Sequence, residues 1–411
     1  MGKTFVEKML AGKAGEIVTT SPDWILSHDN TSAIIKKFER TGAKKVANRE
    51  KCVIVLDHTA PASLEKYADN HKKIREWIQN QGIKNFFDVG RGICHQVLTE
   101  EGFALPGSII VGADSHTTTY GAFGAFSCGI GRSEVAAVWA LDEIWFRIPE
   151  TIRIKINGKL PEGVFAKDVV LYITGKLGTD GALYKSIEFS GETVDKFSIS
   201  SRMVLTNVAA EMGAKNAWIE PDDKTLYYLE GRARDEFEVI TSDRDANVEK
   251  EFEFDIRTLV PQIATPHEVD NVHPVEEYKG VKFQEGFIGT CTNGRLEDLE
   301  VAAEILKGKK VHPGVRLIII PASREIYTET AKRGYLEIFS EAGALIQSPG
   351  CGPCLGAHQG VLAPGEKALS TANRNFKGRM GSREAEIYLA SPATVAVSCI
   401  RGKIVDPREE V

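Results

Sequence analysis

The sequence predicts an α/β protein, because short apolar runs that suit buried parallel strands alternate with helical segments and end in polar loops. Of its 411 residues, 42% are hydrophobic and 26% are charged, which is usual for a globular protein. A chain of this length accommodates about two to four domains. Breaks in the pattern predict three α/β domains, over residues 1–150, 151–272 and 273–411.

In the first predicted domain, two apolar runs each lead to an aspartate and a histidine. The run VIVL precedes Asp57 and His58, and the run SIIVG precedes Asp114 and His116. An apolar run bounded by polar residues is typical of a buried parallel strand. Open α/β sheets bind their ligands at the carboxyl ends of the strands. Both Asp–His pairs are therefore candidate site residues.

The remaining segments complete the α/β pattern. Residues 63–81 have the spacing of an amphipathic helix. The alternating segment 151–156, followed by an Asn-Gly turn, predicts the first strand of the second domain. Three prolines and weak periodicity predict a linker over 261–274. In the third domain, residues 296–306 are predicted to be helical and 315–320 to form a buried strand.

Two glycine-rich loops of the third domain carry three of the seven cysteines. Cys291 lies in GTCTNG, and Cys351 and Cys354 lie in GCGPCLG. Three thiolates in such loops are suitable ligands for an iron–sulfur cluster. From the spacing alone, the CxxC pair also fits a redox pair or half of a zinc site, although a closed zinc site needs a fourth ligand. The other cysteines are expected to be small buried residues: Cys52, Cys94, Cys128 and Cys399.

The charge of the chain excludes some classes of partner. A net charge of −6 disfavours binding to nucleic acid or to a membrane surface, and no apolar run approaches the roughly 20 residues of a transmembrane helix. The first residues lack the apolar core of a secretory signal. An odd number of cysteines favours a metal or catalytic role over a disulfide framework. We therefore expect a cytoplasmic protein that binds neither nucleic acid nor membrane.

These motifs resemble those of the aconitase superfamily, in particular large subunits of the 3-isopropylmalate dehydratase and homoaconitase type. The resemblance rests on the two cysteine loops and on NRNFKGR at 373–379, and it extends from about residue 28 to residue 391. It implies three α/β domains packed around a 4Fe–4S cluster that Cys291, Cys351 and Cys354 hold, with one iron open to substrate.

The resemblance also implies a missing domain and a partner. Single-chain aconitases carry a fourth, swivelling domain with the serine base, and that domain is absent here. In two-subunit relatives it forms a separate small subunit, so this chain is expected to be active only with such a partner.

Further site residues follow from the resemblance. Six residues match catalytic positions: Asp57, His58, His95, Asp114, His116 and Glu211. Four match substrate-binding positions: His28, where single-chain aconitases have glutamine, Asn207, Arg374 and Arg379. Asp–His pairs hold an imidazole in its charged, acidic form, and arginines bind carboxylates as planar forks. The histidines in polar stretches are expected at the surface: His71, His267, His273 and His312.

The implied reaction is an isomerisation by loss and re-addition of water. A base from the small subunit removes the proton, and His116 or His58 assists the departing hydroxyl. The first candidate is the conversion of 2-isopropylmalate to 3-isopropylmalate in leucine biosynthesis. The alternatives are a homoaconitase that acts on homocitrate and homoisocitrate, and another malate-type enzyme such as dimethylmalate dehydratase. The substrate is thus a dicarboxylate or tricarboxylate. RNA binding after cluster loss, which occurs in some single-chain relatives, is disfavoured by the acidic charge.

Overall fold

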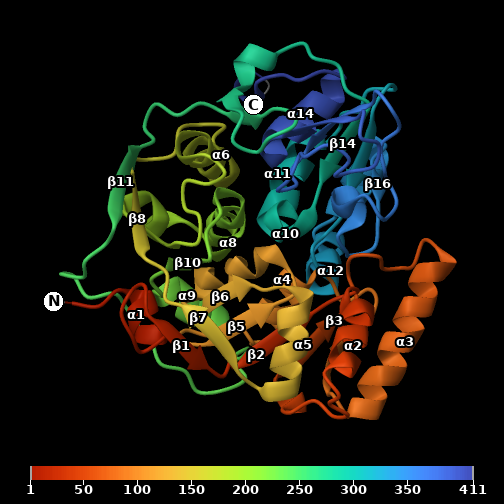
Figure 1. Cartoon of the computed structure of the whole chain (residues 1–411). Coiled ribbons are helices and arrows are strands. Elements are labelled where there is room, and N and C mark those ends of the chain that lie inside the picture. Colours follow the sequence, from red (N-terminus) through yellow and green to blue (C-terminus); the bar gives the residue numbers. More distant parts are fainter. Residues whose placement is uncertain (1, 410–411) are drawn as a thin grey trace.

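The computed structural model describes residues 2–409. Its strands form three large sheets that follow one another along the chain, with helices packed against them (Figure 1). A separate antiparallel ribbon pairs β1 (Ile17–Thr20) with β7 (Ile144–Arg147). The α/β class that the sequence predicts is confirmed. Within the described residues, no helix is both long enough and apolar enough to cross a membrane.

The first large sheet is parallel throughout, with the strand order β4-β3-β2-β5-β6. Its strands are β2 (Trp24–Ser27), β3 (Cys52–Val55), β4 (Asn85–Phe87), β5 (Ile109–Gly112) and β6 (Phe126–Gly129). The predicted runs VIVL and SIIVG correspond to β3 and β5, which are buried along their whole length. The helical segments are α1 (Phe5–Met9), α2 (Thr31–Arg40), η1 (Arg49–Lys51), α3 (Glu65–Gln81), α4 (Cys94–Glu100), η2 (Ser115–Phe123) and α5 (Arg132–Leu141).

Aromatic side chains join the helices that cover this sheet. The rings of Trp77 on α3 and Trp139 on α5 stack with centroids 4.8 Å apart. Phe38 on α2 makes edge contacts with both of them. Aromatic pairs of this kind add about 0.5–1.5 kcal/mol to the effect of burial alone. The helices α2, α3 and α5 therefore pack together against one face of the sheet. The ends of the strands remain free to contribute to a site.

The second sheet is also parallel and has the order β10-β9-β8-β11. Its strands are β8 (Thr151–Asn157), β9 (Ser186–Ser190), β10 (Asn216–Ile219) and β11 (Lys250–Asp255). The helical segments of this part are α6 (Ala166–Leu177), α7 (Glu192–Lys196), α8 (Ile199–Val208), η3 (Ala209–Met212) and α9 (Asp223–Leu229).

The third sheet has seven strands in the order β13-β12-β18-β17-β14-β15-β16. They are β12 (Gln262–Ala264), β13 (Val272–Pro274), β14 (Glu285–Ile288), β15 (Arg316–Ile319), β16 (Leu345–Ile346), β17 (Lys367–Ser370) and β18 (Glu386–Leu389). The helical segments are η4 (Val275–Tyr278), α10 (Thr290–Asn293), α11 (Leu296–Leu306), α12 (Arg324–Lys332), α13 (Tyr335–Ala342), η5 (Gly352–Leu355), α14 (Pro392–Arg401) and η6 (Pro407–Glu409).

The prediction of a linker over 261–274 is wrong, because two sheet strands, β12 and β13, lie within this segment. They pair with each other in antiparallel fashion, and β12 joins the third sheet through β18. Pro274 is tolerated because β13 is the edge strand, where a missing backbone N–H removes no bond to a further strand. We propose that the third domain begins near residue 260, and that the first boundary lies near residue 150, where the second sheet begins.

A close backbone contact joins the first domain to the second. A Cβ atom on Gly121 of η2 would lie 1.6 Å from the carbonyl oxygen of Ala217 in β10. Only glycine permits this approach, as the glycine-rich sequence of 121–131 suggests. The contact matters for the site, because η2 begins directly after Asp114 and contains His116.

Candidate active site

The predicted site residues gather around one cavity of about 420 Å³. His95 on α4 and Cys291 on α10 lie in its wall, and both helices are near the centre of Figure 1. Its walls include ten of the predicted residues: His28, His58, His95, Asp114, His116, Cys291, Cys351, Cys354, Arg374 and Arg379. The other three, Asp57, Asn207 and Glu211, each contact one of these through a hydrogen bond.

The first sheet places three of these residues through its strand order. His28, Asp57 and Asp114 follow β2, β3 and β5, which are adjacent in the sheet. In the sheet, β3 lies on one side of β2 and β5 lies on the other. The strand order changes direction at β2, so a crevice opens at the carboxyl ends of these strands. The crevice brings together side chains that are far apart in the sequence.

Asp114 is the centre of a cluster of histidines. Its carboxylate lies 3.0 Å from Nε2 of His95, 3.4 Å from Nε2 of His58 and 3.4 Å from Nδ1 of His116. It also accepts a hydrogen bond from the backbone N–H of His116 at 2.8 Å. Burial alone raises a carboxyl pKa, but the hydrogen bonds from these histidines outweigh burial and hold the pKa of Asp114 well below its usual range. Asp114 is therefore a buried anion at neutral pH.

His58 and His28 are neighbours whose pKa values shift in opposite directions. Their rings stack with centroids 3.8 Å apart. Burial opposes the charged form of His58, but the carboxylates of Asp57, 2.6 Å away, and Asp114 raise its pKa well above the usual value. Burial and the charge of His58 lower the pKa of His28 to about 4. Asn30 donates a hydrogen bond to Nε2 of His28 at 2.8 Å, an arrangement that suits a neutral imidazole.

This difference between the two histidines is measurable. At pH 7 we expect the His58 imidazole to be protonated and that of His28 to be neutral, with His28 taking up a proton only near pH 4. Long-range ¹H–¹⁵N spectra of the histidine-labelled chain, recorded between pH 4 and pH 9, report both states directly.

Linkage provides a control for the same prediction. Between about pH 6.5 and pH 4 the unfolded chain binds a proton at His28 and the folded chain does not, so this residue lowers stability as the pH falls. In His28→Gln, which keeps a polar group, we expect the loss of stability over this interval to be smaller. An imidazole at His28 that titrates near pH 6.5 would contradict the assignment.

A second chain of contacts links His116 to an arginine. Nε2 of His116 lies 2.7 Å from Oε1 of Glu211, and Nε of Arg374 donates to both oxygens of Glu211 at 2.8 and 2.9 Å. Burial and the charge of Arg374 lower the pKa of His116. Hydrogen bonds to Asp114 and Glu211 raise it by more, so the pKa lies above the usual value. Both His116 and Arg374 therefore present positive charge to the cavity.

The three predicted cluster ligands lie in the same cavity wall and receive N–H groups from neighbouring side chains. Asn207 and Asn373 direct their amide nitrogens at Sγ of Cys291, at 3.2 and 3.4 Å. Nη2 of Arg379 lies 3.8 Å from Sγ of Cys354. Hydrogen bonds and positive charge around sulfur are what thiolate-bound iron–sulfur clusters need. This donor set therefore fits a cluster held by three cysteines.

The pKa values of these thiols reflect their crowding. Burial raises the pKa of Cys291 to about 12. A shared proton raises the pKa of Cys351 and lowers that of Cys354. The other cysteines are buried, as the sequence predicts: Cys52, Cys94, Cys128 and Cys399. Of these, only Cys94 is near the site, and its backbone N–H donates to Asp57 at 2.7 Å.

Several residues of the site escaped the sequence analysis. Asn373 contacts Cys291, and Ser115 accepts a hydrogen bond from Arg374 at 2.8 Å. Asn373 begins the motif NRNFKGR, and Ser115 stands between Asp114 and His116, so these positions were an available signal. Arg132 also lines the cavity, and its only signal is its place directly after the glycine-rich segment 121–131.

The prediction that His71 lies at the surface is wrong. His71 is buried, and its Nε2 lies 2.7 Å from Oδ1 of Asp29. Asp29 in turn accepts backbone N–H groups from Asp57, His58 and Thr59. This pair therefore fixes the loop that carries His58. The missed signal was the spacing along α3. His71 precedes the buried Ile74, Trp77 and Ile78 at the spacing of one helix face.

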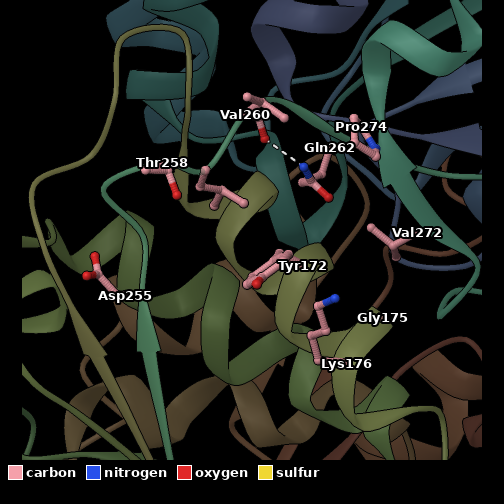
Figure 2. A pocket seen from close by; sticks show the side chains of 10 residues that line it. Tyr172, Gly175, Lys176, Asp255, Thr258, Val260, Gln262, Val272 and Pro274 are labelled. Atoms are coloured by element: carbon pink, nitrogen blue, oxygen red, sulfur yellow. Dashed lines mark hydrogen bonds between the residues drawn. The ribbon is translucent and has the colours of Figure 1, made fainter.

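A second cavity of about 270 Å³ lies at α6 and contains none of the predicted residues. Figure 2 shows its wall, where Tyr172 and Lys176 of α6 face Gln262 and the strand around Val272. No group of titratable residues that suits the predicted chemistry gathers there.

Comparison with known proteins identifies relatives of this chain. A sequence profile of the Aconitase family (aconitate hydratase) matches residues 3–402. The "3-isopropylmalate dehydratase large subunit 1" of Methanopyrus kandleri is 53% identical over 415 residues, which cover 99% of each chain. The "probable methanogen homoaconitase large subunit" of Methanosarcina mazei is 52% identical over 388 residues, which cover 94% of this chain and 98% of the relative.

A solved structure shares the fold. Aconitase X of Thermococcus kodakaraensis in its holo form aligns with a TM-score of 0.54 at 12% identity, covering 89% of this chain and 88% of the other. At this identity the likeness concerns the fold alone.

Proposed function

This chain belongs to the aconitase family, and from that premise we propose that it is the large subunit of a hydro-lyase that isomerises 2-isopropylmalate to 3-isopropylmalate. The observation that carries the proposal is the cavity in which three cysteines, four histidines and three arginines meet. The full-length similarity to a relative named as a 3-isopropylmalate dehydratase large subunit supports the choice of substrate. The alternative is a homoaconitase large subunit, which the 52% identical relative supports.

The proposal includes a 4Fe–4S cluster held by Cys291, Cys351 and Cys354. When bound, such a cluster supplies a Lewis acid at its open iron, which polarises a hydroxyl or carboxylate of the substrate.

The side chains of this subunit provide the charges that the reaction needs. Arg374 and Arg379 line the cavity, and their guanidinium groups suit the carboxylates of a malate-type substrate. Arg374 is held by Glu211 and Ser115, so its position is set before the substrate arrives. A prepared cation of this kind lowers the entropy cost of orienting the substrate.

A protonated histidine is the proposed acid. The elimination removes a hydroxyl group, which leaves as water after it takes a proton. His58 and His116 both have raised pKa values and both line the cavity. His28 has a lowered pKa and is proposed to act as a neutral hydrogen-bonding group. In the rehydration step, the same imidazole takes the proton back from water.

The base that removes the substrate's carbon-bound proton is proposed to come from a small subunit with the swivel domain. Exposed apolar side chains near the cavity support a docking surface there. Leu355 lines the cavity and is 38% exposed, and Phe376, in the loop that carries Arg374, is 42% exposed. Apolar groups of this kind beside a polar site often mark a contact with another protein.

We further propose that the enzyme is cytoplasmic. Its seven cysteines are free thiols, and a reducing compartment keeps thiols in this state.

One anaerobic experiment tests the proposed function. The chain is reconstituted with iron and sulfide, and the hydration of isopropylmaleate and of homoaconitate is measured with and without the cognate small subunit. We expect about four irons per chain and activity on isopropylmaleate only in the complex. Activity on homoaconitate alone would favour the alternative. Stoichiometric zinc without iron uptake would contradict both.

A further inference from the structure

The buried lysine and arginine side chains of residues 2–409 are Lys167, Arg202 and Arg295, each with an exposed fraction of 3% or less. A buried charge costs free energy unless an opposite charge compensates it. Arg202 has this compensation in an ion pair with Asp222. Within the described part of the chain, neither Lys167 nor Arg295 has a carboxylate in ion-pair contact. Both contact the loops of the active site instead, since Arg295 donates to the carbonyl oxygen of Cys291 at 2.7 Å.

Lys167 reaches the site from the second domain. It lies on α6, it is 0% exposed, and its amine donates to the carbonyl oxygens of Thr371 and Ala372 at 2.9 and 2.7 Å. These carbonyls directly precede Asn373, whose amide contacts Cys291. Carbonyl dipoles satisfy the hydrogen bonds of an ammonium group, but they do not neutralise its charge.

The negative charge that suits this ammonium group comes from the cysteines. Burial lowers the pKa of Lys167 to about 8, and Cys291 and Cys354 are the groups whose charge opposes this effect most when their sulfurs are ionised, as the sulfurs of cluster ligands are. The carboxylates of Asp298 and Asp168 raise the pKa of Lys167 by less. The nearby carboxylate of Asp168 is directed elsewhere, because it accepts the backbone N–H groups of Phe165 and Gln262.

We propose that Lys167 is a positioning residue that acts as the buried counter-charge of the cluster held by Cys291, Cys351 and Cys354. This inference rests on the proposed function. A cluster with three thiolate ligands is an anion, so a cation in the low-dielectric interior strengthens its binding. The same cation favours an added electron and so raises the reduction potential of the cluster. Lys167 and the cluster therefore each reduce the cost of burying the other.

The substitution Lys167→Gln tests the charge while keeping one donor for the loop. The full chain is reconstituted anaerobically and examined alone and in complex with the small subunit. We expect iron loss to a chelator to be about tenfold faster. We also expect a tenfold shift in the one-electron equilibrium, which lowers the midpoint potential by about 59 mV. A redox titration followed by electron paramagnetic resonance measures this potential.

Lys176→Gln is the matched control. Lys176 lies on the same helix, is exposed, and has its amine 5.3 Å from the centre of the Tyr172 ring (Figure 2). Its removal takes the same charge from the solvent side, and we expect the potential and the iron loss to be unchanged. Lys167→Arg keeps the charge at the buried position, and we expect it to keep the wild-type potential despite the larger side chain.

The outcomes separate a charge effect from a merely structural one. If Lys167→Gln lowers the melting temperature of the cluster-free and cluster-loaded chains equally and leaves the potential unchanged, the amine only supports the loop and the inference is wrong. The inference is equally wrong if Lys167→Arg folds but its midpoint potential falls by as much as that of Lys167→Gln. A wild-type chain that takes up no iron would instead overturn the proposed function itself.

Discussion

Cys351→Ser is expected to abolish activity by removing the cluster. A serine hydroxyl is a poor ligand for iron compared with a thiolate, and a cluster with two remaining cysteines loses its hold. The Lewis acid contributes several kcal/mol of transition-state stabilisation, and about 4 kcal/mol corresponds to roughly 10³-fold in rate. We therefore expect activity in the complex to fall by about 10³-fold or more. Iron and sulfide content, together with the rate of isopropylmaleate hydration, measure the effect.

Cys399→Ser provides the matched control. Cys399 is also fully buried, but it belongs to the core of the third domain, away from the cavity. Replacing its thiol by a hydroxyl is expected to cost about 1–3 kcal/mol of stability through an unsatisfied polar group and to leave the iron content intact. If Cys351→Ser retained its iron and its activity, the assignment of Cys351 as a ligand would be wrong.

Asp114→Asn is expected to lower kcat by about 10²–10⁴-fold, the usual contribution of a general acid or base. Asp114 lies within 3.4 Å of three histidines and supports the raised pKa values of His58 and His116. Without its charge both pKa values fall, so less of each imidazole is protonated at neutral pH. The alkaline limb of the pH–rate profile is therefore expected to move to lower pH, while the iron content stays unchanged.

The sign of the accompanying stability change follows from the same pKa values. A histidine with a raised folded-state pKa adds stability that is fully present below about pH 6.5 and is lost as the pH rises through the folded-state value. Asp114→Asn reduces this contribution of His58 and His116, so the variant is expected to lose more stability below pH 6.5 than at alkaline pH.

Asp88→Asn makes the same change in charge at an exposed position. Asp88 is 46% exposed and pairs with Arg75 at 2.7 Å, an arrangement worth about 0–1 kcal/mol. Its kcat and pH profile are expected to match those of the wild type. An unshifted alkaline limb in Asp114→Asn would indicate that neither His58 nor His116 is the acid.

Local sequence was enough to predict the strands that carry the site. The runs before Asp57 and Asp114 are continuous and apolar because the strands are buried on both faces, and this pattern depends only on neighbouring residues. The cysteine loops could also be recognised from local sequence, since glycine and proline around three thiols determine the backbone conformation of a loop wherever they occur. Strand order then brings His28, Asp57 and Asp114 together, although no local pattern encodes that order.

What the sequence alone determined is therefore the α/β class, the family motifs and the identity of ten of the residues that line the cavity. Tertiary structure decided the rest, because it depends on which groups meet across domains. His71 became a buried partner of Asp29, β12 and β13 joined the third sheet, and Lys167 reached the carbonyls beside Asn373. The charge states of His28 and His58 also belong to this level, since burial and distant carboxylates set them. Neither effect is visible in a linear pattern of residues.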